Sequence, residues 1–492
     1  MKEKSDGNIL DEEVLQTGNL SLMELTSLVV GSIIGGGIFD LMQNMAAVPA
    51  GAGAILIAWI IAGIGMIFLA LSFKNLSMKR QDLDAGIYSY AEEGFGKYMG
   101  FNSAWGYWAS AWLGDVGYAT LLMSSVGYFL PIFGNGQNIW SIVAASAILW
   151  LCHFLLLRGA ESASFINTVV TIAKLVPIFL FIIVMIVAFK LNVFTSGFWL
   201  TPSGHFQFSD VMKQVRGTML VTVWVFIGVE GAVVFSGKAK KREDIGRATV
   251  LGIITVILIY MLVTLLSLGV MKQSQVASLS QPAMAALLEH VIGKTGAIIV
   301  NLGLIVSVAG AWLSWTMFAS QVPYEAAKNG TFPSFFAKEN KYHAPVNSLI
   351  ITNVLTELFI LTFLFTSSAY QLFYTISTAA ILIPYMFSAF YQLKYTMHED
   401  PQTPGHTGNF IVGIIASIYT VWLVYSAGTT NLLLLMILFA VGIPVYIYLQ
   451  KHDNHAKKVF GPVELCFAIL FVILGILAIF LLLTHKITIS GS

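Results

Sequence analysis

The amino-acid sequence predicts an all-α polytopic membrane protein in which the first ten spans form two halves of five. Of the 492 residues, 57% are apolar and 10% are charged, and the mean hydropathy is +0.80, which no water-soluble fold accommodates. Runs of roughly 20 apolar residues, enough for a spanning helix, recur from residue 22 to residue 484. Glycine-rich interruptions lie in the middle of the first and sixth runs, at matching positions of the two halves.

Short polar stretches divide the chain into thirteen predicted spans. The ninth and tenth are separated only by Thr366, Ser367 and Ser368, so a count of twelve is the alternative. The stretch from Asp82 to Tyr98 is too polar to span and is predicted to be a cytoplasmic helix packed against the bundle. The predicted spans are 22–47, 51–73, 98–130, 138–157, 163–190, 212–237, 246–272, 289–323, 345–365, 367–395, 408–427, 429–449 and 461–484.

The basic residues predict the orientation, because short cytoplasmic loops retain Lys and Arg during insertion. Every second connection between spans is rich in Lys and Arg. The remaining connections either contain almost none of these residues or are longer, with the basic residues spread out. The N-terminus is therefore expected in the cytoplasm, and thirteen spans place the C-terminus outside. The basic residues of the predicted cytoplasmic connections are Lys74, Lys79, Arg80, Lys238, Lys240, Lys241, Arg242, Arg247, Lys328, Lys338, Lys341, Lys394, Lys451, Lys457 and Lys458.

Composition and motifs exclude several other classes. Lys plus Arg number 26 and Asp plus Glu 25, so the charge of +1 leaves no basic block for nucleic acid. Cys152 and Cys466 lie inside apolar runs, which argues against a disulfide framework or a cysteine metal site, and no cofactor is expected. The polar first 20 residues lack the features of a cleavable signal. With no HExxH or nucleophile-elbow motif, an enzyme is not expected.

The two glycine-rich interruptions predict breaks in the first and sixth spans. The first contains Gly35, Gly36 and Gly37, and the second is WVFIGVEG from Trp224 to Gly231. Unwound backbone is tolerated in a membrane only where it lines a cavity or packs on protein, and it exposes NH groups and carbonyls. The glycine NH groups would suit a carboxylate and the carbonyls an α-ammonium. Close helix packing by small residues is the alternative interpretation.

The carbonyls expected to accept from an α-ammonium surround the two breaks. They belong to Ile33, Trp224 and Ile227.

Four ionisable residues are predicted at mid-membrane, where each needs a partner or a role. Asp115 would pair with a cationic substrate group or with a neighbouring helix. Lys174 would place its ammonium against the broken backbone of the first span, as a strut or as a proton carrier. Glu230 would take up protons or satisfy loose backbone, and Glu357 is predicted to be a helix–helix contact.

Two tryptophans are candidate partners for a cationic side chain. Trp224 lies at the second break, and Trp315 lies in the eighth span. An indole face attracts an ammonium or guanidinium. Packing is the alternative role for either ring.

Five stretches in the right order resemble the amino acid, polyamine and organocation (APC) superfamily, and within it the basic amino acid antiporters. They are GSIIGGGIF, RGAESASFINTVVTIAKLVP, WVFIGVEGAVVFSGKAKK, WTMFASQVPYEAAKNGTFPSFF and TISTAAILIPY, and the resemblance runs from about residue 20 to about residue 450. It implies a LeuT-like five-plus-five inverted-repeat transporter fold with twelve core helices and here a thirteenth. The implied division is a cytoplasmic tail at 1–20, repeats at 21–190 and 212–395, helices 11 and 12 at 408–449, and helix 13 at 461–484.

The resemblance also implies roles for individual residues. It assigns the substrate carboxylate to the glycine triplet 35–37 and the α-ammonium to the carbonyls named above. Lys174 resembles the lysine that replaces a sodium ion in sodium-independent relatives. The implied path of the substrate side chain passes Ser110, Ala111, Trp224, Trp315 and Ser377, with Glu230 as a pH-responsive group. Tyr107 and Tyr385 are the implied gates, and Tyr107 is also a predicted substrate contact.

Two departures from the antiporter pattern bear on the substrate. Gly36 stands where the pattern has a serine, which leaves the carboxylate to backbone groups. Asp115 stands where the pattern WxGN has asparagine, and a carboxylate favours a full cationic head. Arginine–ornithine and histidine–histamine exchange both remain open.

The expected function is exchange of a cationic amino acid for its metabolic product across the plasma membrane by alternating access. A proton-coupled symporter of cationic amino acids is the first alternative. A membrane sensor that binds an amino acid without moving it is the second, although the loops offer no output domain. The expected partners are the two small-molecule substrates and the lipid bilayer, and the oligomeric state is left open.

Overall fold

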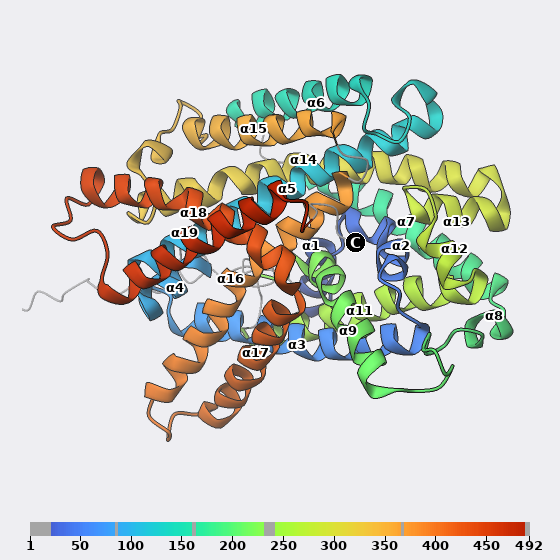
Figure 1. Cartoon of the computed structure of the whole chain (residues 1–492), viewed down its shortest axis with the longest axis horizontal. Coiled ribbons are helices and arrows are strands. Elements are labelled where there is room, and N and C mark those ends of the chain that lie inside the picture. The colour runs from blue at the N-terminus through green and yellow to red at the C-terminus, as the bar shows by residue number, and fades with distance from the viewer. Residues whose placement is uncertain (1–20, 84–86, 160–163, 231–241, 366–368, 488–492) are drawn as a thin grey trace, which may run out of the picture.

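The computed structural model describes residues 21–83, 87–159, 164–230, 242–365 and 369–487. Within these ranges the secondary structure is helical, apart from one isolated bridge between Glu339 and Pro345. The predicted N-terminal tail, the join at 366–368 and the basic residues 238–241 lie outside these ranges. Long helices run lengthwise across the molecule, with α4 near one end and α8, α12 and α13 near the other (Figure 1).

The first half of the chain contains a broken first span. The helices are α1 (Leu22–Ile33), η1 (Gly36–Phe39), α2 (Leu41–Ala47), α3 (Ala52–Lys79), α4 (Ile87–Phe95), α5 (Lys97–Phe129), η2 (Pro131–Phe133), α6 (Ile139–Leu157), α7 (Ser164–Ala188) and α8 (Leu191–Thr195).

The second half and the C-terminal helices follow. They are α9 (Phe208–Phe226), α11 (Arg242–Val270), α12 (Gln273–Ala277), α13 (Ala283–Ile292), α14 (Lys294–Lys328), η4 (Ser334–Ala337), α15 (Val346–Ile360), η5 (Leu361–Leu364), α16 (Ala369–His398), α17 (His406–Ser426), α18 (Gly428–Tyr448), η6 (Leu449–Asp453) and α19 (Pro462–Leu483).

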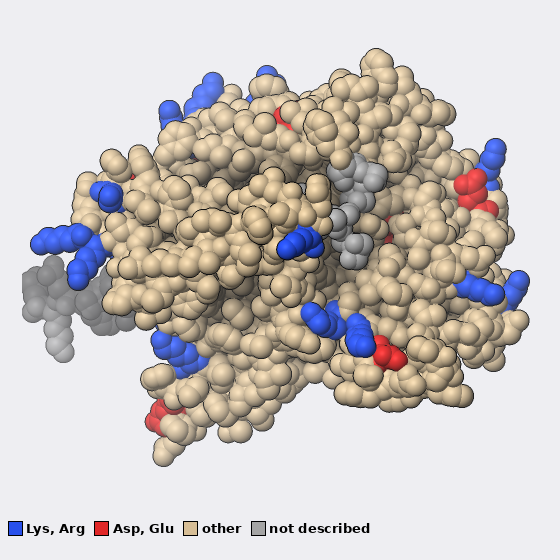
Figure 2. Space-filling view, viewed as in Figure 1, with Lys and Arg blue, Asp and Glu red and all other residues tan. Residues whose placement is uncertain are grey.

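Each predicted span corresponds to a helix or to a broken pair of helices. Within the described ranges, nine helices are long and apolar enough to cross a membrane: α3, α6, α11, α14, α15, α16, α17, α18 and α19, with the one-turn extensions η5 and η6. Four further predicted spans correspond to α1 with α2, to α5, to α7 and to α9. Most of the surface in Figure 2 is neither acidic nor basic, as a lipid-facing surface requires.

Predicted boundaries are wrong for the second and eighth spans: the second, expected to end at residue 73, continues in α3 to Lys79. The span expected over 289–323 begins within α13, which ends at Ile292, and α14 continues to Lys328. Gly293 separates the two helices with φ of +74°, a conformation that glycine adopts without a steric penalty. Val291 and Ile292 precede this glycine, whereas Lys294 and Thr295 follow it, so a glycine before polar residues was a usable signal for the turn.

The helix α5 lies at the centre of the bundle, where it packs against α14 and α16. Nearly all of its residues are buried. Small residues allow this close packing: a Cβ at Gly106 would lie 2.9 Å from the carbonyl oxygen of Ala380. Helix α5 belongs to the first half of the chain, and α14 and α16 belong to the second. A site between these helices is therefore built from both halves.

At one end of the molecule, connections that the charge pattern places in the cytoplasm contact one another. Lys79 donates to Glu399 over 2.5 Å, which joins the end of α3 to the connection after α16. The backbone NH of Ser334 donates to Asp453 over 2.7 Å, which joins the connections after α14 and α18. The predicted helix within Asp82–Tyr98 is confirmed as α4, which packs against α5 and α16 at this end.

At the other end, two connections predicted outside contact the ends of helices. The NH of Gly53, in the first turn of α3, donates to the carbonyl of Phe198 over 2.8 Å. The Ser124 hydroxyl, near the end of α5, donates to the carbonyl of Gln281 over 2.7 Å. Successive connections thus lie alternately at the two ends of the molecule, which is the arrangement that thirteen successive crossings produce.

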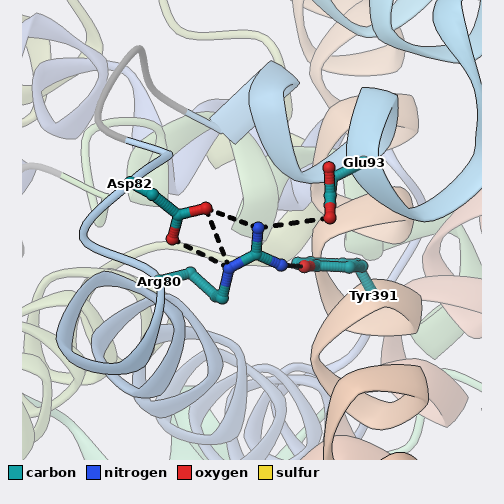
Figure 3. A network of polar contacts seen from close by, with 4 residues as sticks. All are labelled: Arg80, Asp82, Glu93 and Tyr391. Carbon is teal, nitrogen blue, oxygen red and sulfur yellow. Dashed lines mark hydrogen bonds and ion pairs between the residues drawn. The ribbon is translucent and has the colours of Figure 1, made fainter.

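Arg80, the residue that ends α3, holds three elements together at the end of the molecule that carries α4 (Figure 3). Its guanidinium donates to Asp82 at 2.6 and 2.9 Å, to Glu93 of α4 at 3.2 Å and to the hydroxyl of Tyr391 of α16. Arg80 is only 17% exposed. Five guanidinium donors in a fixed plane suit such a multiple contact.

We predict that Arg80→Ala lowers the stability of the detergent-solubilised chain by roughly 1–2 kcal/mol, since several bonds of a shielded charge are lost together. The matched control is Arg247→Ala, because Arg247 is 66% exposed and lies 3.8 Å from Asp244 within one helix. Such a pair contributes little. Thermal unfolding by intrinsic fluorescence measures both variants, and an equal loss in the two would contradict the interpretation.

The Arg80 guanidinium also lowers the pKa of Asp82 below its ordinary value. A carboxylate whose pKa is lower in the folded state stabilises that state above its unfolded pKa, which is about 4. The contribution is lost as the pH falls through the lowered folded-state pKa. We therefore expect wild type and Arg80→Ala to converge in stability on acidification below about pH 4.

Candidate functional site

The first break lies between α1 and η1, where the sequence predicts it. Helix α1 ends at Ile33, and Ile34 and Gly35 are extended before η1 begins at Gly36. The Lys174 ammonium, on α7, donates to the carbonyls of Gly31 and Ile34, each over 2.7 Å. This lysine satisfies carbonyls that the end of α1 leaves without a helical partner.

Close neighbours explain the glycines of the first break. A Cβ on Gly37 would lie 2.6 Å from Nε1 of Trp224, and one on Gly35 would lie 3.0 Å from the hydroxyl of Tyr118. A Cβ on Gly31, by contrast, would have no atom within 4 Å. The glycines at 35 and 37 therefore permit close approach of α5 and α9.

The second break follows α9. The helix ends at Phe226, and Ile227 and Gly228 form a turn in which the NH of Val229 donates to the carbonyl of Phe226 over 3.0 Å. Gly228 has φ of +103°. The Glu230 carboxylate turns back to accept from the NH of Gly228 over 3.2 Å. The Tyr260 hydroxyl of α11 donates to the carbonyl of Val225 over 2.8 Å. Both breaks therefore have specific side-chain partners for freed backbone groups.

A small cavity lies where the two breaks meet α5, α14 and α16. Its free volume is about 30 Å³, so a bound amino acid requires the walls to move apart. Its walls combine exposed backbone, hydroxyl groups and aromatic faces, with Trp224 on one side of the site and Ser110 and Ser377 on another. The lining residues are Ser32, Ile33, Gly35, Gly37, Ile38, Ser110, Ala111, Gly114, Tyr118, Trp224, Val225, Ile227, Tyr260, Trp315 and Ser377.

The cavity brings together most of the residues singled out from the sequence as substrate contacts. The Ser377 hydroxyl donates to the carbonyl of Ser110 over 2.7 Å and so ties α16 to α5 beside the cavity. The predicted residues in the lining are Ile33, Gly35, Gly37, Ser110, Ala111, Trp224, Ile227, Trp315 and Ser377.

Three predicted substrate contacts lie outside this lining. Gly36 packs against Tyr118 and Val308, and Tyr107 contacts Glu230 instead. Asp115 is fully buried and accepts from the Thr316 hydroxyl over 3.2 Å, so its visible partner is on a neighbouring helix.

Sequence reasoning missed six lining residues. Gly114 and Tyr118 had a usable signal, because they follow Ser110 and Ala111 at the three- and four-residue spacing of one helix face. Tyr260 had none, since a single tyrosine in an apolar run has no distinguishing pattern. The missed residues are Ser32, Ile38, Gly114, Tyr118, Val225 and Tyr260.

Glu230 is clamped by two tyrosines from different helices. Its two oxygens accept from Tyr107 of α5 over 2.7 Å and from Tyr385 of α16 over 2.6 Å. All three side chains are buried. Tyr107 and Tyr385 both lie beyond the cavity toward the end that carries α4, since α5 begins and α16 ends there. The three residues singled out as gates or pH-responsive groups thus form one cluster.

The cavity is covered on its opposite side by aromatic side chains. The Trp224 indole NH donates to the Tyr370 hydroxyl over 3.3 Å, and the ring packs on Tyr374 with centroids 5.8 Å apart. Both tyrosines lie in the first turns of α16, away from the α4 end. Aromatic contacts therefore close the cavity on this side, and the Glu230 cluster closes it on the other.

The predicted role of Glu357 as a helix contact is confirmed. Its carboxylate on α15 accepts from the Ser146 hydroxyl of α6 over 2.7 Å. This bond lies away from the cavity.

Known proteins resemble this chain along most of its length. A profile described as amino acid permease matches residues 20–447. The arginine/ornithine antiporter of Pseudomonas aeruginosa is 47% identical over 458 residues, which cover 91% of this chain and 94% of that protein. The arginine/agmatine antiporter of Chlamydia felis is 42% identical over 475 residues, covering 95% and 98% of the two chains.

Among solved structures, MhsT in complex with L-phenylalanine matches with a TM-score of 0.57 at 15% identity, covering 84% of this chain and 99% of that one. At this identity the match concerns the fold alone, and it confirms the predicted LeuT-like class. With the family profile spanning most of its residues, this chain belongs to the amino acid permease family of the APC superfamily.

Proposed function

We propose that the chain exchanges a cationic amino acid for its metabolic product across the cell membrane by alternating access, with its N-terminus in the cytoplasm. The observation that carries the proposal is the cavity at the meeting point of two broken helices, closed on both sides. Antiporters of arginine with ornithine or agmatine, 42–47% identical to the chain, support the same function.

The two breaks provide opposite ends for a zwitterion. Backbone NH groups of the glycine triplet 35–37 hold the carboxylate in this proposal, because they follow the break. The carbonyls of Ile33, Trp224 and Ile227 accept from the α-ammonium. The repeats proposed at 21–190 and 212–395 account for one break in each half.

The cationic side chain lies between aromatic and hydroxyl groups in this proposal. Trp224, Trp315 and Tyr118 offer ring faces, and such faces attract a cation in a partly desolvated site. Ser110 and Ser377 add acceptors on α5 and α16. Asp115 lies directly after Gly114, so its contact with a substrate requires a rearrangement away from Thr316.

Lys174 acts as a strut in this proposal, because both of its hydrogen bonds go to the backbone of the first break. The Glu230 cluster acts as the inner gate, and Trp224 with Tyr370 forms the outer cover. Opening toward the cytoplasm then requires that α5 and α16 release Glu230.

We predict that purified protein in proteoliposomes takes up labelled arginine only when the vesicles contain an exchange partner. Separate vesicles loaded with ornithine, agmatine or histamine identify that partner, and labelled histidine tests the second substrate pair. Protein-free liposomes are the control. Uptake into empty vesicles driven by acid outside would contradict exchange and support the proton symporter.

We predict that Gly37→Ala slows exchange about tenfold or more, whereas Gly31→Ala leaves it nearly unchanged. The new methyl group at position 37 would lie 2.6 Å from the Trp224 ring, whereas position 31 is open. Overpacking costs about 1–3 kcal/mol, and 1.4 kcal/mol corresponds to about tenfold. Initial rates of arginine uptake into loaded vesicles measure both variants, and equal rates would contradict the assigned cavity wall.

A further inference from the structure

A second and larger hollow lies at the end of the molecule opposite α4. It has a volume of about 570 Å³ and shares no lining residue with the central cavity. We call it the outer pocket. It is lined by Gln43, Ser124, Gly127, Tyr128, Gly134, Asn135, Gln137, Ser280, Gln281, Pro282, Ala285, Ala286, Glu289, Asn301 and Gln371.

The one charged side chain in the described lining of the outer pocket is negative. Glu289, half-buried on α13, is its single acidic side chain, and the lining contains no Lys, Arg or His within the described ranges. A carboxylate in a concave, partly shielded site attracts cations more strongly than an exposed one, because the field is less screened. An anionic ligand would find no charged partner there.

The buried amides of the outer pocket add unused acceptors. Gln43 donates its amide NH₂ to the carbonyl of Leu279 over 2.5 Å, and Asn301 donates to the carbonyl of Ala297 over 2.9 Å. Their amide oxygens are buried, and each lacks a partner among the described residues. Gln43 is 8% exposed and Asn301 is fully buried. Buried acceptors without partners are costly, so a ligand that donates to them is favoured.

The outer pocket lies over the outer cover of the central cavity. Gln371 of its lining directly follows Tyr370, which accepts from Trp224. Gln43 lies on α2, which continues the first span beyond its break. A ligand in the outer pocket is therefore next to the elements that must move when the cavity opens on this side.

We propose that the outer pocket is a second binding site for the ammonium or guanidinium head of a cationic amino acid, with Glu289 as its counter-charge and Gln43 and Asn301 as acceptors. The substrate class rests on the proposed function. The preference for a cation rests on residues of the outer pocket, namely the carboxylate of Glu289 and the amide oxygens of Gln43 and Asn301.

The test measures protection of a cysteine placed in the outer pocket. Ser280→Cys, at an exposed lining position, is introduced into the full chain carrying Cys152→Ala and Cys466→Ser, and the purified protein reacts with a maleimide in detergent. L-arginine at roughly ten times its Kd should slow labelling about tenfold, since only the unoccupied fraction reacts. L-citrulline, which has a neutral ureido group in place of the guanidinium, should protect far less.

Two matched variants test the counter-charge. Glu289→Gln should abolish protection by arginine. Glu325→Gln should retain it, because Glu325 lies at the opposite end of the molecule, beside Lys328. Equal protection by citrulline, or full protection in Glu289→Gln, would overturn the proposal. Gln371→Cys serves as a second reporter if Ser280→Cys fails to fold, and absence of arginine protection at both positions would also overturn it.

A third variant separates this site from the central cavity. Trp315→Ala removes a wall of the cavity without touching the outer cover, and protection by arginine should persist in it. Loss of protection would show that labelling reports a movement driven by the central site, which would refute a separate outer site. Labelling needs no flux, so exchange measured in proteoliposomes tests the proposed function independently.

Discussion

The need to satisfy unwound backbone inside a membrane determines this architecture. A helix that stops at mid-depth leaves carbonyls without partners, and lipid offers none. Lys174 meets that need from α7, with one ammonium between the carbonyls of Gly31 and Ile34. Tyr260 does the same for Val225 from α11. Without such partners the two breaks would be too costly to keep, and no polar cavity would form between them.

The second requirement is close packing around α5. Gly106 allows α16 to approach the backbone of α5, while Ser110 joins α16 through Ser377. The same helix supplies Tyr107 to the Glu230 cluster and Tyr118 to the cavity. The proposed substrate contacts and gate contacts therefore lie on a single helix, so a tilt of α5 against α16 would affect both.

Much of the fold could be predicted from the sequence, because bilayer thickness imposes a length and lipid imposes a composition. The break at Gly35 was predictable too, since consecutive glycines destabilise the interior of a helix. The role of Tyr260 was not predictable, because it depends on packing between helices distant in the sequence. The turn at Gly293 is local, and its signal is a glycine directly after an apolar run and before Lys294. Helical periodicity predicts which residues of α5 share a face with Asp115. It does not predict how α5 is rotated against α14, and that rotation places Asp115 beside Thr316.

The two closures of the cavity are anchored on a single short stretch of chain. Trp224 contacts the outer cover, Glu230 is held by the inner tyrosines, and Gly228 with its left-handed backbone lies between them. In the proposed mechanism, a change of torsion at that glycine would move both anchors together and so link release of one barrier to retention of the other. A continuous leak of ions would require both sets of bonds to fail at once, which lets the cell keep its membrane potential while solutes change sides.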